Sequence, residues 1–286
     1  MSYNALELDV SVAFYLLCSA AVALILILLG QPGWRRWQRQ RLLRNPFPAH
    51  WRKMLRTRVP LLGRLPAALQ LQLKQRMQVF IAEKPFIGCA GLHISEEMRV
   101  VIAAQACLLT LNRSMDLYAN VRQILVYPGA FLVNRSALDG AGVLSEQRQA
   151  LSGESWSQGQ VILSWQDTLE GAADPRDGLN VVIHEFAHQL DQENGAPQGA
   201  PPPRAGDTGY NATRWKQVFQ EAFSELRAQA RAGHAGLLNH YGAQDAAEFF
   251  AVVSEVFFEQ PGELQTQYPA LYAELRGYYQ LDPAGW

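Results

Sequence analysis

The longest uncharged stretch of the chain lies near its start and limits the possible folds most. Residues 11–29, SVAFYLLCSAAVALILILL, contain no charged side chain. As a helix that rises about 1.5 Å per residue, this run spans roughly the 30 Å hydrocarbon core of a bilayer. A cleaved leader has positive charge before its apolar run, whereas only Glu7 and Asp9 precede this one. We therefore expect a retained transmembrane anchor at 11–30 after a short tail at 1–10; a buried core helix or a cleaved leader is the alternative.

A basic segment rich in tryptophan follows the apolar run. Its tryptophans and arginines are Trp34, Arg35, Arg36, Trp37, Arg39, Arg41 and Arg44. Trp favours the headgroup level of a membrane, and Arg favours the cytoplasmic side and anionic lipid. The predicted topology is single-pass in the inner (cytoplasmic) membrane, with the body in the cytoplasm. Nucleic-acid binding is another use for such arginines, but the anchor already accounts for them, so we expect no nucleic-acid partner.

The distribution of charge divides the chain into a basic part, up to residue 82, and an acidic part after it. Residues 10–82 hold 12 of the 25 Lys and Arg and none of the 26 Asp and Glu, while residues 83–286 hold 13 basic and 24 acidic residues, a net charge of −11. The basic neck and the acidic body therefore need different explanations. The three cysteines, Cys18, Cys89 and Cys107, form no CxxC pair and lie far along the chain from the histidines near residue 184. No disulfide framework or thiolate-rich metal site is indicated.

The rest of the chain has several helical patterns and two strand patterns. Helical spacing and start signals predict helices at 65–84, 95–111, 211–233, 244–262 and 269–279, and one that begins after Asp177-Gly178 and ends near Asn194-Gly195. Strands are predicted at 121–133, broken at Pro128-Gly129, and at 161–165, with loops at 152–160 and 195–209. We expect a basic juxtamembrane linker at 31–49 and one helix-dominated α+β domain with a small sheet at 50–286.

The stretch HEFAH, residues 184–188, carries the most chemistry. Residues i and i+4 of a helix share a face, so His184 and His188 can aim ring nitrogens at one ion, and imidazole suits zinc. Glu185 lies beside that ion, where it can take a proton from a coordinated water of lowered pKa. Asp191 follows on the same stripe and is a candidate to orient a ligand imidazole. The alternative is a helix with two surface or core histidines, but HExxH arises by chance in on the order of one such chain in a hundred.

A zinc site of this kind needs a third protein ligand. A third histidine in HExxHxxGxxH form is absent, and so is a glutamate about 20 residues downstream. We expect the helix at 244–262 to supply this ligand, because Glu248 and Glu255 lie on one stripe of it. Glu248 could instead close a capping box with Asp245. Spacing therefore leaves Glu248 and Glu255 both open as the third ligand.

Four motifs occur together in the body: LVYPGAF (125–131), GESWSQGQVILSW (153–165), HEFAHQLDQENG (184–195) and YGAQDAAEFFAVVSEVFF (241–258). In combination they resemble the Mlc titration factor A family of zinc-dependent peptidases. The resemblance covers roughly residues 50–283. The arrangement from the tyrosine to the glutamate is also distantly similar to the catalytic domain of anthrax lethal factor.

The resemblance implies a zincin-like fold of the gluzincin type, with one Zn²⁺ per chain. It implies metal ligands and a general base, namely His184, His188 and Glu248 with Glu185. It also implies that Tyr241 donates a hydrogen bond to the oxyanion, a role for which His240 is a weaker candidate. A packing aromatic at a helix entry is the other interpretation of Tyr241. Glu255 is then expected behind the ligands as a supporting carboxylate, although a solvated helix residue is the alternative.

These features predict a membrane-anchored zinc metallopeptidase that hydrolyses peptide bonds with the help of Glu185. A peptide or protein substrate would pair along the strand at 161–165, and the loop at 195–209 would act as a lid. The alternative is a zinc-containing regulatory module that sequesters a transcription factor with little or no turnover; a zinc hydrolase for non-peptide substrates is a third possibility. The member that names the family is soluble and binds the glucose repressor Mlc. Because this chain adds an anchor, a transcription-factor partner is implied by the resemblance alone.

Overall fold

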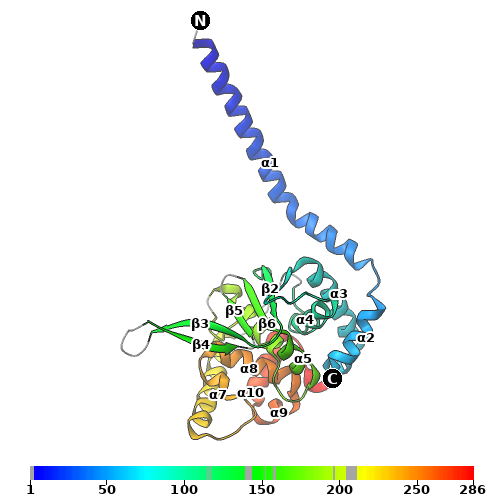
Figure 1. Ribbon diagram of the computed structural model, residues 1–286, viewed down its shortest axis with the longest axis vertical. Helices are drawn as coiled ribbons and strands as arrows, with labels where there is room; N and C mark the ends of the chain where they lie inside the picture. Colours follow the sequence, from blue (N-terminus) through cyan, green and yellow to red (C-terminus); the bar gives the residue numbers. More distant parts are fainter. Residues whose placement is uncertain are drawn as a thin grey trace. The chain divides into compact units, whose positions relative to one another are not determined.

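A computed structural model describes residues 3–114, 116, 118–138, 144–151, 153–156, 159–195, 197–203 and 211–286. The chain divides into two compact units, Met1–Pro46 and Phe47–Trp286. Figure 1 shows the helices and strands of each unit.

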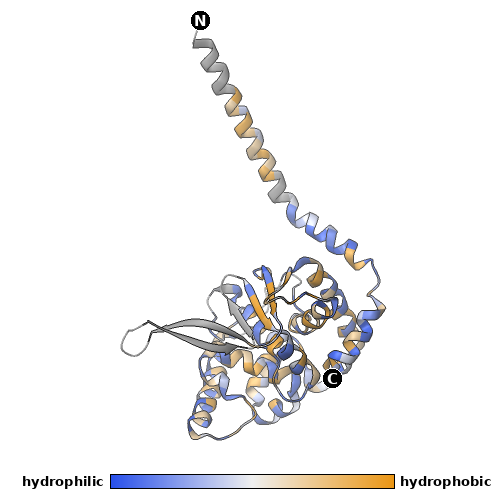
Figure 2. Ribbon diagram, viewed as in Figure 1, coloured by the Kyte–Doolittle hydropathy of each residue, from blue (hydrophilic) through white to orange (hydrophobic). Residues whose placement is uncertain are grey.

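The first unit is the single helix α1 (Tyr3–Leu43). Within Val12–Leu43 it has a stretch that is long and apolar enough to cross a membrane. Every side chain from 12 to 25 is exposed, and Figure 2 shows this hydrophobic part giving way to a hydrophilic one toward the end of the helix. By length and composition, this apolar N-terminal helix could span a bilayer.

Helix α1 runs further than the sequence indicates. The predicted linker at 31–49 is helical as far as Leu43, with Pro32 inside the helix. A proline removes one backbone N–H, but the stretch 34–43 is rich in Arg, Gln and Leu, which are good helix formers, and contains no Gly or Pro. The irregular connection is therefore only residues 44–48.

The second unit is a helix-dominated α+β body. Its helices are α2 (Ala49–Arg58), η1 (Pro60–Arg64), α3 (Ala67–Glu83), α4 (Glu96–Leu108), α5 (Trp165–Ala173), α6 (Val181–Asp191), η2 (Gln192–Asn194), α7 (Ala212–Ala232), η3 (His240–Ala243), α8 (Ala246–Glu259), α9 (Pro261–Gln267), α10 (Pro269–Tyr279) and η4 (Pro283–Gly285). Side-chain caps fix several starts: Ser95 accepts from the Met98 N–H, and Asn180 and Asp245 cap α6 and α8 in the same way. These starts confirm the helices predicted after Ser95, Asp177-Gly178 and residue 244.

The main sheet has four strands in the order β1-β2-β6-β5. Strands β1 (Phe86–Gly88), β2 (Gln123–Tyr127) and β6 (Gln160–Ser164) are parallel, and β5 (Gly153–Trp156) is antiparallel to β6. Strands β3 (Phe131–Leu138) and β4 (Leu144–Leu151) form a separate antiparallel pair. The small sheet therefore combines a parallel part with an antiparallel strand at one edge.

Two predictions about this sheet are wrong. The expected loop at 152–160 contains β5, and the strand expected at 161–165 to hold substrate is interior, because β6 pairs with β2 on one side and β5 on the other. The sequence GESW has no run of β-branched residues, so its strand depends on pairing with β6 rather than on local propensity. Trp165 begins α5 instead of ending the strand, since Ser164 caps that helix by accepting from the Asp167 N–H.

The core of the body surrounds α8 and α6. Every residue of α8 from Phe249 to Glu259 is buried, and α6 packs against α8, α4, α5 and β5. The apolar side of α6 is fully buried at Val182, Ile183, Phe186 and Leu190. Burying each such side chain contributes about 1.5–3 kcal/mol, so α6 is held firmly within the body. Figure 1 shows the C-terminal helices α7 to α10 gathered on one side of the sheet.

Candidate metal centre

The turn before α6 sets the position of the two histidines. The Asp177 carboxylate accepts a hydrogen bond from the Leu179 N–H at 2.9 Å, and Gly178 has a φ of +74°, a conformation that favours glycine. Asn180 then caps the helix, because its Oδ1 accepts from the Ile183 N–H at 3.0 Å. With α6 beginning at Val181, His184 and His188 lie one turn apart, and their ring centroids are separated by 4.9 Å.

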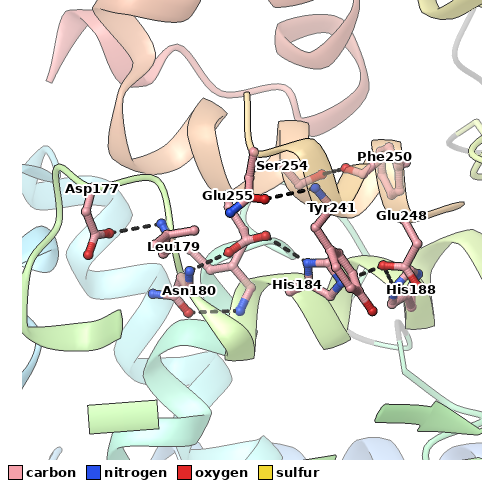
Figure 3. Close-up of polar contacts among 12 residues, drawn as sticks. Asp177, Leu179, Asn180, His184, His188, Tyr241, Glu248, Phe250, Ser254 and Glu255 are labelled. Atoms are coloured by element: carbon pink, nitrogen blue, oxygen red, sulfur yellow. Dashed lines mark hydrogen bonds and ion pairs between the residues drawn. The ribbon is translucent and has the colours of Figure 1, made fainter. Parts of the chain in front are cut away.

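Both imidazoles face one carboxylate on α8. The Glu248 Oε2 lies 3.0 Å from the His184 Nε2 and 3.5 Å from the His188 Nε2. The ligand atoms of the three residues all lie within 4.8 Å of one another, so the group could hold a metal ion. Figure 3 shows the three side chains pointing toward one another from α6 and α8. Their side chains are only 9–15% exposed, which keeps bulk water from competing for the ligand atoms.

The contacts at the start of α8 show which of its glutamates faces the histidines. Asp245 Oδ1 accepts from the backbone N–H groups of both Ala247 and Glu248, each at 2.9 Å. Asp245 thus caps the helix by itself, and the Glu248 carboxylate faces the histidines. Glu255, two turns further on, contacts the other nitrogen of His184, with 2.8 Å between Glu255 Oε1 and His184 Nδ1. The two alternatives left open by spacing are therefore separated: Glu248 belongs to the metal-type group, and Glu255 lies behind it.

Glu255 also links the start of α6 to α8. Its second oxygen accepts a short hydrogen bond from the Asn180 backbone N–H, and the Asn180 side chain donates to Glu259 Oε1 at 2.9 Å. The pKa of Glu259 is raised to about 9: burial is the largest cause, the hydrogen bond from Asn180 opposes it, and the nearby carboxylates of Glu255 and Asp177 act in the same direction as burial. One asparagine therefore joins the cap of the His helix to two buried carboxyl groups.

The electrostatics of the group favour a cation among its three members. Burial would lower the pKa of His184, but the carboxylates of Glu255 and Glu248 outweigh it and hold that pKa well above its ordinary value. Burial would raise the pKa of Glu248, yet its bonds to His184 and His188 hold it far below its usual range. Two imidazoles and a carboxylate form a ligand set that binds zinc and similar divalent ions. The residues present therefore fit a divalent metal ion.

Glu185 and Tyr241 lie at the edge of this group. Glu185 is buried, and its charge helps to raise the pKa of His184. Tyr241 is half-buried in η3, with its ring centroid 5.7 Å from that of His184, and Figure 3 shows it beside that imidazole. Asn239 fixes this turn by accepting from the Tyr241 N–H at 2.9 Å. His240, the weaker candidate, directs its Nε2 to the carbonyl of His234 at 3.0 Å.

Asp191 contacts backbone amides rather than a ligand imidazole. Its two oxygens accept from the N–H groups of Gln198, Gly199 and Ala200 at 2.7, 2.6 and 2.9 Å. The prediction that it orients an imidazole therefore does not match its contacts, because the carboxylate is turned to the loop after α6. Glu255 makes the contact that sequence spacing had suggested for Asp191.

The loop predicted to be a lid, 195–209, is described only in part. Residues 196 and 204–209 lie outside the described residues. In the described part, the Trp215 indole N–H donates to the Gly199 carbonyl at 3.1 Å, and Arg113 donates to the Pro202 carbonyl at 3.4 Å. Together with the contacts of Asp191, these bonds tie residues 198–202 to the body, which does not favour a lid there.

Sequence reasoning missed Asn180 and Glu259. Asn180 carried a usable signal, since an Asn directly before a helical pattern is a preferred N-cap. Glu259 follows Glu255 by four residues and so lies on the same stripe of α8. Its role as a buried partner of Asn180 depends on the packing of α6 against α8, which no local pattern encodes.

Comparison with known proteins agrees with this geometry. Residues 34–280 match the family described as glucose-regulated metallo-peptidase M90. The uncharacterized protein slr2042 of Synechocystis sp. is 38% identical over 263 residues, which cover 92% of this chain and 94% of that protein. Mlc titration factor A of Enterobacter sp. is 31% identical over 231 residues (79% and 84%), and that of Salmonella arizonae is 30% identical over 254 residues (87% and 96%). The chain therefore belongs to the glucose-regulated metallo-peptidase M90 family.

Proposed function

We propose that this protein is a membrane-anchored, zinc-dependent peptidase of the gluzincin type, with a zincin-like body that faces the cytoplasm. The observation that carries the proposal is the convergence of both HExxH imidazoles on Glu248, with Glu185 adjacent on the same helix. Membership of a metallopeptidase family supports the same activity.

His184, His188 and Glu248 would hold one zinc ion and leave a coordination position for water or substrate. Bound there, zinc supplies Lewis acidity, which acidifies a water and polarises the scissile carbonyl. With zinc bound, the Nδ1–H of His184 would donate to Glu255, and the Nε2 lone pair of that ring would be left for the ion. The supporting carboxylate therefore selects the tautomer that ligation requires.

Glu185 is proposed as the general base and acid. Its buried carboxylate, one residue after His184, accepts the proton of the attacking water and later gives it to the leaving amine. The Tyr241 hydroxyl is proposed to donate a hydrogen bond to the oxyanion that develops on the attacked carbonyl. The position of its ring beside His184 supports this role.

The edge strand β5 is proposed as the substrate-binding strand, in place of β6. An extended peptide can add to a sheet only where a strand has an unpaired side, and β5 is the terminal strand of the sheet order. β5 also packs beside α6, which carries HExxH. A substrate paired there would run past the proposed zinc site.

Anchoring in the inner membrane is proposed from α1 and the basic residues after its apolar part. The apolar stretch is long enough to span a bilayer, and arginines follow it while only acids precede it. This asymmetry favours a cytoplasmic body.

A second candidate function is sequestration of a transcription factor. Relatives at 30–31% identity are named Mlc titration factor A, a name that describes titration of Mlc rather than hydrolysis. In that case the metal centre would stabilise a binding surface, and Glu185 would have no chemical role.

The test compares the full-length protein in neutral detergent with Glu185→Gln at matched zinc content, using a mixed peptide library. Loss of a general base should lower the cleavage rate by about 10²–10⁴-fold while zinc stays bound. The matched control is Glu263→Gln, which makes the same change at an exposed position on α9 and should cleave like the wild type. Equal cleavage by wild type and Glu185→Gln would contradict the mechanism. No cleavage by the wild type at full zinc occupancy would favour the sequestering function.

A further inference from the structure

A cavity of about 540 Å³ lies at the start of the second unit, among α2, η1 and α3. None of the metal-centre residues lines it. Its volume falls within the roughly 300–1,000 Å³ of small-molecule sites, so it can hold a ligand larger than an inorganic ion.

The floor of the cavity is apolar. It is formed by aliphatic side chains that are themselves part of the core, namely Leu55, Val59, Leu62 and Leu73. Each of them is at most 8% exposed. The floor of the cavity is therefore part of the hydrophobic core of the body.

The rim of the cavity is cationic. Arg52 and Arg56 lie one turn apart on α2, and Lys74 comes from α3. No carboxylate lines the cavity, and within the described part of the chain none of these three side chains has an ion pair or hydrogen bond. The next arginine of α2 differs, since Arg58 pairs with Glu97 at 2.6 Å. Three unneutralised cations above an apolar floor are complementary to an anionic amphiphile.

We propose that this cavity binds an anionic phospholipid of the bilayer, with the phosphate among Arg52, Arg56 and Lys74 and the first part of an acyl chain on the leucine floor. The inference rests on the membrane anchoring proposed above. Residues 30–48 join the apolar run of α1 to α2, so a membrane-inserted α1 would tether the second unit, and with it the cavity, to a surface of lipid headgroups.

The lining fits a lipid better than other anions. It contains no aromatic side chain on which a nucleobase could stack. A free phosphate would satisfy the cations but leave the space above the leucine floor to water, whereas an acyl chain would fill it. This site is separate from the arginines that follow the apolar run at 35–44, which belong to the first unit.

The experiment titrates the full-length protein, in neutral detergent, with dihexanoyl phosphatidylglycerol by isothermal titration calorimetry. Dihexanoyl phosphatidylcholine has the same tails without net charge, and inorganic phosphate has the charge without tails. We expect one phosphatidylglycerol per chain, bound at least about tenfold more tightly than phosphatidylcholine, because the three cations attract its net negative charge and repel the choline ammonium of phosphatidylcholine. The Arg52→Gln/Arg56→Gln variant should weaken binding about tenfold. The control Arg227→Gln/Arg231→Gln removes the same charge from two exposed positions one turn apart on α7 and should bind like the wild type.

A second variant keeps the charges and narrows the cavity. Gly63 lines it, and a Cβ at that position meets no atom within 4 Å, so Gly63→Leu should fold and still weaken binding. Zinc content and thermal midpoint, unchanged in each variant, confirm folding. Equal affinity for the two lipids, equal binding by Arg52→Gln/Arg56→Gln, or full competition by inorganic phosphate or an acidic peptide would overturn the proposal. Vesicle flotation of the full chain tests the anchor separately, and the peptide assay tests the peptidase.

Discussion

Helices α1 and α8 are both strongly apolar, yet they have opposite surroundings. In α1, Leu16 and Leu17 are 65% and 71% exposed, whereas every residue of α8 from Phe249 to Glu259 is buried in the core of the body. Apolar content alone therefore does not distinguish a helix that could cross a bilayer from one buried in a protein core. The positions of the charges do distinguish them.

In α1 the charges lie outside the apolar run, and in α8 they lie within it. Residues 11–34 of α1 contain no charged side chain, and arginines follow. Along one stripe of α8, by contrast, three glutamates interrupt the apolar sequence: Glu248, Glu255 and Glu259. Each contacts α6 or its cap, through His184, His188 or Asn180. Acids inside a buried helix thus mark where its partners, and the candidate site, are found.

A lysine substituted into each helix tests this contrast, and it has the largest expected effect on free energy. Val253→Lys buries an unpaired ammonium at a position that is 0% exposed, so it should cost about 5 kcal/mol and unfold the body. Leu17→Lys should leave the folding of the body unchanged but cost about 3 kcal/mol of membrane insertion. Denaturant unfolding measures the first effect, and vesicle flotation measures the second.

The matched controls are Val253→Ala and Leu17→Ala, which keep both positions uncharged. If Leu17→Lys lowered the stability of the body and left flotation unchanged, α1 would be a packed protein helix, and the contrast with α8 would fail.

A buried acid of α8 should make folding depend on pH. Because the pKa of Glu259 is raised from 4.5 to about 9, the folded state keeps its proton in a range where the unfolded state has lost it. This contribution to stability is complete below pH 4.5 and is lost as the pH rises toward 9. Glu259→Gln keeps an acceptor for Asn180 and cannot ionise, so it should become more stable than the wild type by on the order of several kcal/mol at pH 9.

Urea unfolding of both proteins at pH 5, 7 and 9 measures this difference. Glu263→Gln, at an exposed position, serves as the control and should follow the wild type at every pH. A constant gap between wild type and Glu259→Gln would mean that Glu259 is already ionised in the fold.

The smallest expected effect concerns the carboxylate behind the histidines. Glu255→Gln removes the charged acceptor of His184 Nδ1, so zinc affinity should fall by about 10–100-fold. Competition with a chelating dye measures this affinity. Since Glu255 also accepts from the Asn180 N–H, the unfolding free energy of the metal-free protein must be compared alongside. A loss of stability with unchanged zinc affinity would make Glu255 a purely structural link between α6 and α8.

The parts of the fold and of the candidate site that could be predicted from sequence are those specified by neighbouring residues in the chain. Caps at Ser95, Asn180 and Asp245 and the HExxH spacing are local, so the helices and the histidine pair were accessible. Strand β5 was not, because its identity comes from pairing with β6. Glu248 and Glu255 could not be separated by spacing, since both lie on one stripe and each approaches a different nitrogen of His184.

The contacts of Asp191 have a consequence for the opening of the fold. Three successive amides of an irregular loop, at 198–200, donate to one carboxylate at the end of the His helix. Their protons can exchange with solvent when these bonds break, either because the loop moves away or because the last turn of α6 opens. We expect the loop and the turn that carries His188 to be coupled in hydrogen exchange, although only the turn is helical. Opening of the last turn of α6 would expose these loop amides as well.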